Sequence, residues 1–325
     1  MPIRLLSAIV AVALSAQTPS RPIFRFSTDD FWLNLHHFLY VLGRAEAKMP
    51  DASRAAVAGA PADSERGLAA LTPDERQIWR DAIAFYAAGP SRKDAVFDDS
   101  LSAITSATAD AGDRAEPPAG APIDAALRST LERAAPVYRK SWWTAHREAN
   151  VGRRDDIQAL VDRHGAAVLA YITRAYGMAW RSEGYPVHLS GWANWAGAYS
   201  TNGNLLVMSS LDRATLGYGG LEIAFHEGMH QWDRQMNDLL FAEVRKQGRR
   251  LPANASHAMI FFTAGDAVRR VSPDHVPYAD ANGIWQSGFQ RFKAPLDEVW
   301  KPYLDGTGTR DEAISAFVAR VAVDR

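Results

Sequence analysis

The chain has 325 residues, enough for one large domain or two modest ones, and it contains no cysteine. Disulfides, thiolate zinc sites and iron–sulfur clusters are therefore excluded, and any metal site must use His, Asp or Glu. Because 36 Lys and Arg residues balance 37 Asp and Glu residues, the protein has no global positive field with which to bind nucleic acid.

The first sixteen residues have the pattern of a secretory signal peptide. Arg4 precedes an apolar run over residues 5–14, and the small residues Ser15 and Ala16 follow. The run is shorter than the roughly 20 apolar residues of a membrane-spanning helix, and no later segment reaches that length without a charge. We therefore expect residues 1–16 to be removed and the mature protein to be periplasmic or secreted, without a membrane anchor. A buried N-terminal helix is the alternative.

Residues 17–150 predict a helical region. An apolar helix is expected over residues 30–43, and the capping box that begins at Thr72 opens a helix that ends at Gly89. Further helices are separated by Pro136 and by a loop or linker rich in Ala, Gly and Pro. The helices are expected over residues 93–106, over residues 124–134 and from residue 137 onward, and the loop over residues 107–122.

Residues 151–325 predict a second region that adds a small sheet to a helical pattern. Apolar spacing indicates one long helix over residues 155–181. Two strand candidates follow, at residues 185–190 and 205–208, with an Asn-Gly-Asn turn signal before the second. Further helices are expected near residues 220–235, 237–248, 256–270 and 310–323. The sequence as a whole therefore predicts an α+β fold that is predominantly helical.

The helix expected near residues 220–235 contains an H-E-x-x-H motif at residues 226–230. His226 and His230 share one helix face, so both imidazoles can reach one metal ion, and Glu227 lies beside it. A carboxylate in that place can take a proton from a metal-bound water as the water attacks an amide carbonyl. Ile223 continues this stripe, opposite an apolar arc, which predicts that the stripe lines a cleft. An ordinary amphipathic helix with two exposed histidines is the alternative.

This arrangement resembles the zincin metallopeptidases, in which the H-E-x-x-H helix packs beneath a small twisted sheet. The resemblance covers residues 155–270, which hold the backing helix, both strand candidates and the motif helix. It implies that His226 and His230 bind zinc, that Glu227 is the general base, and that residues 205–208 form the edge strand that aligns a peptide substrate. The metzincin subgroup is excluded, because its glycine and third histidine are replaced by Asp233 and Met236.

The third metal ligand is open at this point. The glutamates after the motif are poorly placed for the ligand of a gluzincin; they are Glu243, Glu298 and Glu312. His257 and Asp266 remain, and they point to opposite faces of the helix expected over residues 256–270. His257 shares an apolar arc and points inward, so it is the expected third ligand, with Asp266 as the alternative.

Other side chains near the motif are candidates for supporting roles. A donor to the developing oxyanion is expected from Tyr278, with His275 and Tyr199 as alternatives. Glu222, one turn before His226, is a candidate to orient a ligand imidazole. The alternative is that Glu222 is an ordinary glutamate on the solvated surface.

These features together predict an exported hydrolase with Zn²⁺ as its cofactor. Its substrate is expected to be a peptide or a small amide, and nucleic acid is not an expected partner. A non-catalytic metal-binding or scaffold protein that retains a zincin-like fold is the alternative.

Overall fold

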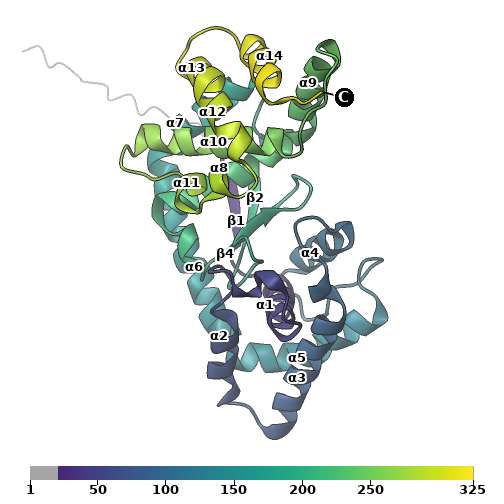
Figure 1. Cartoon of the computed structure of the whole chain (residues 1–325). Coiled ribbons are helices and arrows are strands. Elements are labelled where there is room, and N and C mark those ends of the chain that lie inside the picture. The colour runs from purple at the N-terminus through teal and green to yellow at the C-terminus, as the bar shows by residue number, and fades with distance from the viewer. Residues whose placement is uncertain (1–20, 325) are drawn as a thin grey trace, which may run out of the picture.

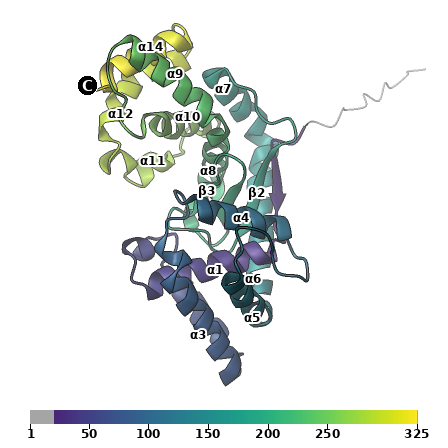
Figure 2. The same cartoon turned by 90° about the vertical axis from the view of Figure 1, so that its right-hand side faces the viewer.

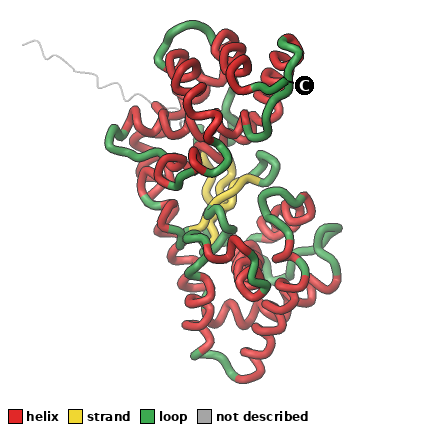
Figure 3. Tube along the Cα trace, in the orientation of Figure 1, coloured by secondary structure: helices red, strands yellow, loops and turns green. Residues whose placement is uncertain are grey.

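The computed structural model describes residues 21–324 and shows an α+β protein, 64% helical, with one four-stranded mixed sheet. The signal peptide expected over residues 1–16 lies outside the described residues. The sheet lies in the middle of the molecule, between a lower and an upper group of helices (Figure 3). Between residues 21 and 324, none of the helices combines the length and the apolar character that a bilayer crossing requires.

The sheet has the strand order β1-β2-β4-β3. β1 (Phe24–Ser27) pairs in parallel with β2 (Tyr185–Ser190), which pairs in parallel with β4 (Leu206–Ser209). β3 (Ala198–Ser200) pairs antiparallel with β4 and forms an edge of the sheet. Both strand expectations are confirmed, but the expectation that residues 205–208 form the edge is wrong. The short β3 adds to the sheet beyond β4, so β4 is an inner strand.

Apolar side chains fill two cores, one on each face of this sheet. Successive residues of a strand point to opposite faces, so neighbours on β4 reach different cores. Leu206 packs in the upper core, with the upper group of helices, whereas Val207 packs in the lower core, with the lower group. Both faces of the sheet are therefore covered, as is usual for parallel strands.

The lower core is built around α1 (Phe31–Glu46), which is buried along almost its whole length. The other helices of this group are α2 (Ala60–Leu68), α3 (Pro73–Ala88), α4 (Asp99–Ala111) and α5 (Ala125–Ser141). The capping box expected at Thr72 is confirmed, because Thr72 and Glu75 exchange side-chain and backbone hydrogen bonds.

Two expectations for this region are wrong. α5 continues through Pro136 without a break, because that residue is exposed and water can satisfy the carbonyl that loses its partner. α4 begins at Asp99 rather than at residue 93, because the Asp98 side chain caps it by accepting a hydrogen bond from the Leu101 N–H. It then extends to Ala111, into the segment expected to be a loop.

A long helical path connects the lower and upper groups along one side of the molecule (Figure 1). It comprises α6 (Trp143–Leu160), a π-helical turn (Val161–Gly165) and α7 (Ala166–Tyr176). The helix expected over residues 155–181 therefore starts earlier and stops earlier, at Gly177, whose φ of +63° is left-handed. The expected division between residues 150 and 151 falls inside α6.

The upper group contains the remaining helices. They are α8 (Gly217–Met229), α9 (Asp233–Lys246), α10 (Ala255–Val271), α11 (Tyr278–Ala281), α12 (Gln290–Pro295), α13 (Lys301–Leu304) and α14 (Arg310–Val321). A 3₁₀ turn, His230–Trp232, separates α8 from α9, so the motif helix ends earlier than expected. In Figure 2, α8 lies between α10 and the sheet, and α8 contacts both.

Candidate metal centre

The motif helix α8 presents one face to the upper core and the other to a pocket. Its apolar arc packs in the core through residues that include Leu221, Phe225 and Met229. The stripe expected to face a cleft lines a pocket of about 460 Å³; its residues are Ile223, His226, Glu227 and His230. The expectation that this stripe lines a cleft is therefore confirmed.

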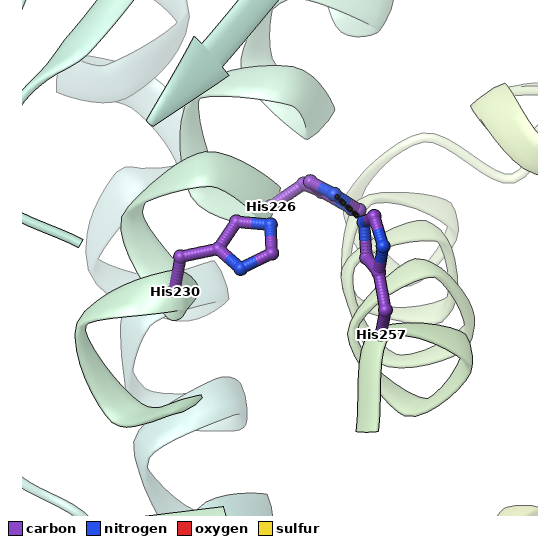
Figure 4. A group of neighbouring side chains, drawn as sticks. All are labelled: His226, His230 and His257. Carbon is purple, nitrogen blue, oxygen red and sulfur yellow. Dashed lines mark hydrogen bonds between the residues drawn. The ribbon is translucent and has the colours of Figure 1, made fainter. Parts of the chain in front are cut away.

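Three imidazoles meet in the pocket from two helices (Figure 4). His226 and His230 come from α8 and the turn that follows it, and His257 comes from the first turn of α10. One ring nitrogen of each lies within 4.8 Å of the other two, and His226 Nε2 is 3.1 Å from His257 Nε2. Nitrogen ligands about 2.0–2.1 Å from a tetrahedral zinc ion lie about 3.3 Å from one another. The 3.1 Å separation is close to this value, and the 4.8 Å limit allows the other two separations to be wider.

Asp266, the alternative third ligand, lies elsewhere. Its carboxylate accepts hydrogen bonds from Tyr171 Oη at 2.5 Å and from Arg270 Nε at 3.1 Å. Lys301 Nζ adds a second cation 3.7 Å from the same carboxylate. Of the two candidates, only His257 joins the histidine cluster.

The electrostatics of the cluster favour neutral imidazoles at His226 and His257. Burial, followed by the charges of the neighbouring histidines, lowers the pKa of His226 well below its usual value. The same two causes lower the pKa of His257 to about 3. Neutral imidazole is the form that binds a metal ion, so both side chains are ready to act as ligands at neutral pH.

His230 differs because it has a carboxylate partner. Its Nδ1–H donates a hydrogen bond to Asp233 Oδ2 at 2.7 Å, which leaves Nε2 available to the cluster. Burial lowers the pKa of His230, but the hydrogen bond and the nearby Glu227 carboxylate outweigh it, and the pKa is raised. No sequence motif assigns a role to Asp233, although its position three residues after His230 on a helical path is a usable signal.

The Glu227 carboxylate lies directly beside the cluster. One oxygen is 4.0 Å from His226 Nε2, and the other is 4.0 Å from His230 Nε2. Burial raises the pKa of Glu227, and the neighbouring His230 partly opposes this rise. Ser200 Oγ on β3 donates a hydrogen bond of 2.8 Å to the Glu227 backbone carbonyl, so the edge strand is tied to the motif helix. Ser200 was missed because β3 was not predicted.

Of the three candidates for an oxyanion donor, Tyr278 lines the pocket, and its hydroxyl donates a long hydrogen bond of 3.5 Å to the Ala196 backbone carbonyl. Tyr199 also borders the pocket, but its hydroxyl is bonded to His37 Nε2 at 2.7 Å, in the lower core. His275 Nε2 is bonded to Glu222 Oε2 at 2.5 Å. Burial, with the nearby Asp212 and Glu227 carboxylates, raises the pKa of Tyr278 to about 12, so its hydroxyl keeps its proton at neutral pH.

Glu222 anchors the loop that carries Tyr278. The side chain is almost fully buried and accepts hydrogen bonds from the Tyr278 backbone N–H at 2.9 and 3.0 Å. Its second partner is His275, from the same loop. The hydrogen bonds of Glu222 thus hold residues 275–278 against α8 instead of orienting the His226 imidazole.

Part of the pocket wall comes from residues that lie far from the motif in the sequence. Arg54 and Phe97 belong to the first half of the chain, where no sequence pattern connects them to the site, and Trp195 belongs to the connection between β2 and β3. No short-range spacing links them, and only the fold brings them together. Comparisons of the chain with protein-family models, with curated proteins and with solved structures find no match.

Proposed function

We propose that the protein is a zinc-dependent peptidase. One observation carries the proposal: three imidazoles from two helices converge within 4.8 Å, with the Glu227 carboxylate 4.0 Å from two of them. His226, His230 and His257 would hold the zinc ion, the three protein ligands typical of a catalytic site. A bound zinc ion supplies a Lewis acid that polarises a carbonyl and makes water a nucleophile near neutral pH.

The remaining residues of the pocket supply proton transfer and charge stabilisation. Glu227 takes a proton from water as the water oxygen bonds to the amide carbon, and it delivers a proton to the nitrogen as the carbon–nitrogen bond breaks. Burial raises the pKa of Glu227, and a higher pKa makes the carboxylate a stronger acceptor of the proton from water. The Tyr278 hydroxyl, which is protonated at neutral pH, donates a hydrogen bond to the oxygen that gains negative charge.

The edge strand supports a peptide as the substrate. β3 lies at the sheet edge and lines the pocket through Ala198, Tyr199 and Ser200. An extended peptide can pair with such an edge through backbone hydrogen bonds, which places one of its amides over the pocket. The packing of α8 against a small mixed sheet also supports a zincin-like core, and the pattern of residues 1–16 supports export.

The proposal is tested with purified mature protein, a mixture of peptides and mass spectrometry of the products. Wild-type protein with one zinc ion per chain should cleave peptides. Glu227→Gln should reduce the rate about 10²- to 10⁴-fold and keep the zinc, because a general base is lost and a ligand is not. Glu298→Gln, which removes an exposed carboxylate outside the pocket, should cleave at the wild-type rate.

Two other outcomes would contradict the proposal. Stoichiometric zinc without cleavage by the wild-type protein would favour a non-catalytic metal-binding protein. Failure to bind zinc at all would contradict both functions.

A further inference from the structure

One part of the pocket wall has no role in the metal cluster. It consists of Arg54, Phe97 and Trp195, and we call it the lower wall because two of its members come from the lower group of helices. Arg54 follows a 3₁₀ turn, Pro50–Ser53, and Phe97 lies just before α4 with 78% of its surface exposed. The Trp195 indole is held by a hydrogen bond from its Nε1–H to Asp94 Oδ2 at 3.1 Å.

Arg54 is held over Trp195 but has no anionic partner. Its Cζ atom lies 4.6 Å from the centre of the indole ring, within the range of a cation–π contact. Across residues 21–324, no carboxylate comes within 4.0 Å of its guanidinium, and the guanidinium donates no hydrogen bond to the protein. The stacking on Trp195 restrains the guanidinium and leaves its five N–H donors available.

The other charged groups that line the pocket have partners. Asp233 accepts the hydrogen bond from His230 at 2.7 Å, and Glu222 pairs with His275 at 2.5 Å. Glu227 lies within the histidine cluster. Arg54 is thus, among the described residues that line the pocket, the one Lys or Arg, and it is a charge without a counter-ion.

A planar guanidinium with available donors binds carboxylates in two-pronged geometry, better than any other side chain. Arg54 and Tyr278 line the same pocket, and the Tyr278 hydroxyl donates a hydrogen bond of 3.5 Å to the carbonyl of Ala196, the residue after the Trp195 on which Arg54 stacks. A carboxylate bound at Arg54 would therefore share the pocket with the peptide bond to be cleaved.

We propose that Arg54 binds a carboxylate of the substrate and makes the enzyme selective for peptides with an acidic group next to the cleaved bond. The inference rests on the proposed peptidase function. The exposed Phe97 ring and the Trp195 indole would contact the carbon atoms that precede that carboxylate. The carboxylate can belong to an Asp or Glu side chain or to the C-terminus of the peptide, and the experiment below separates these two sources.

The experiment measures binding rather than cleavage. Zinc-loaded full-length mature protein with Glu227→Gln is equilibrated with three pools of acetylated hexapeptides, and mass spectrometry quantifies the retained peptides. The first pool has a fixed Glu and an amidated end, the second a fixed Gln and an amidated end, and the third a fixed Gln and a free C-terminal carboxylate. Asp and Glu are left out of the other positions.

We expect one of the two carboxylate pools to bind about 10- to 100-fold more tightly than the pool without a carboxylate, the range for hydrogen bonds to charged groups. Arg54→Gln should reduce this preference to less than about twofold. Arg54→Lys should keep part of the preference, because it retains the charge but not the planar donors. Arg92→Gln is the matched control: it removes an exposed arginine that does not line the pocket.

Three results would overturn the inference while the peptidase function stands: equal binding of all three pools, an acidic preference that survives Arg54→Gln, or one that Arg92→Gln abolishes equally. If no pool binds at all, the peptide substrate is wrong as well, and the inference fails with it.

Discussion

His257 completes the histidine cluster because the first turn of α10 faces the side of α8 that carries His226 and His230. His257→Ala should therefore abolish tight zinc binding, since only two imidazoles remain. Asp266→Ala should keep zinc affinity, because that carboxylate is bonded to Tyr171 and Arg270 outside the cluster. A competitive titration against a zinc-binding dye measures both affinities, and circular dichroism checks that both variants fold.

A third variant should have a zinc affinity between those of Asp266→Ala and His257→Ala. Asp233→Ala removes the hydrogen bond that orients His230, and loss of such a partner typically weakens metal affinity about 10- to 100-fold. The expected order of zinc affinity is thus Asp266→Ala, then Asp233→Ala, then His257→Ala. The opposite order for His257 and Asp266 would move the ligand role to the aspartate.

A second residue-scale prediction concerns His37, which is fully buried on α1, away from the metal cluster. Its Nδ1–H donates to the Leu33 carbonyl at 2.9 Å, and its Nε2 accepts from the Tyr199 hydroxyl at 2.7 Å. Burial lowers the pKa of His37 to about 4, against the opposing effect of the Leu33 carbonyl. The usual histidine pKa is about 6.5, so between these values the unfolded chain takes up a proton that the folded protein does not.

The free energy of unfolding should therefore fall as the pH decreases from about 6.5 to about 4. The share of His37 is about 1.4 kcal/mol per pH unit, or about 3 kcal/mol over the window. Urea unfolding at several pH values measures the effect in the wild-type protein and in His37→Gln, which should lose less stability across that window. Equal losses in the two proteins would show that His37 does not contribute.

At the scale of the element, two helical glycines differ in their surroundings, so replacing each by alanine tests close packing at one position and helix propensity at the other. A Cβ atom at Gly228, inside the motif, would lie 2.3 Å from Cη2 of Trp180, so the ring fits against α8 only because this residue is glycine. A Cβ atom at Gly152, in α6, would meet no atom within 4 Å. Gly152→Ala should stabilise the protein by about 0.5–1 kcal/mol through helix propensity, whereas Gly228→Ala should destabilise it by about 1–3 kcal/mol through overpacking.

Urea denaturation of both alanine variants measures these changes. Stabilisation by Gly228→Ala would mean that Trp180 moves aside at little cost, and would contradict the close packing. Destabilisation by Gly152→Ala would contradict the open space at that position.

Elements with a strong local pattern could be predicted from the sequence. The apolar arc and capping signals located α1 and α3, and periodicity located α8, α10 and both inner strands. The i, i+4 spacing of the motif and the inward face of His257 were sufficient to predict the three imidazoles that cluster. These features depend on residues within a few turns of one another.

The features that could not be predicted depend on contacts between residues far apart in the sequence. β1 has only four residues and is a strand because it pairs with β2, about 160 residues later in the chain. β3 has three residues, and without it neither the edge of the sheet nor the contact of Ser200 with Glu227 can be anticipated. Arg54 joins the pocket only through the packing of the lower helices. A local rule for proline predicts a break at Pro136, because it takes no account of the exposed position of this residue in α5.

At the scale of the whole molecule, the sheet belongs to both halves of the chain. β1 precedes α1 in sequence yet forms the strand next to β2, and α6 extends from the lower to the upper group of helices (Figure 1). On β3, the Tyr199 hydroxyl contacts His37 and Thr105 below the sheet, while Ser200 contacts Glu227 above it. The lower helices therefore complete the structure on which the histidine cluster rests.

This architecture predicts that residues 151–325 do not fold alone, although they contain all three histidines of the cluster. The fragment lacks β1 and half of α6, and it exposes the lower face of the sheet, where Tyr199, Leu205 and Val207 are buried in the whole protein. Exposing each such side chain costs about 1.5–3 kcal/mol, so the total approaches the 5–15 kcal/mol that typically holds a domain together. Near-ultraviolet circular dichroism and zinc titration of the fragment should show no fixed tertiary packing and no tight zinc binding, whereas residues 21–325 should show both. A cooperative unfolding transition together with the zinc affinity of the longer chain would instead establish residues 151–325 as an independent domain.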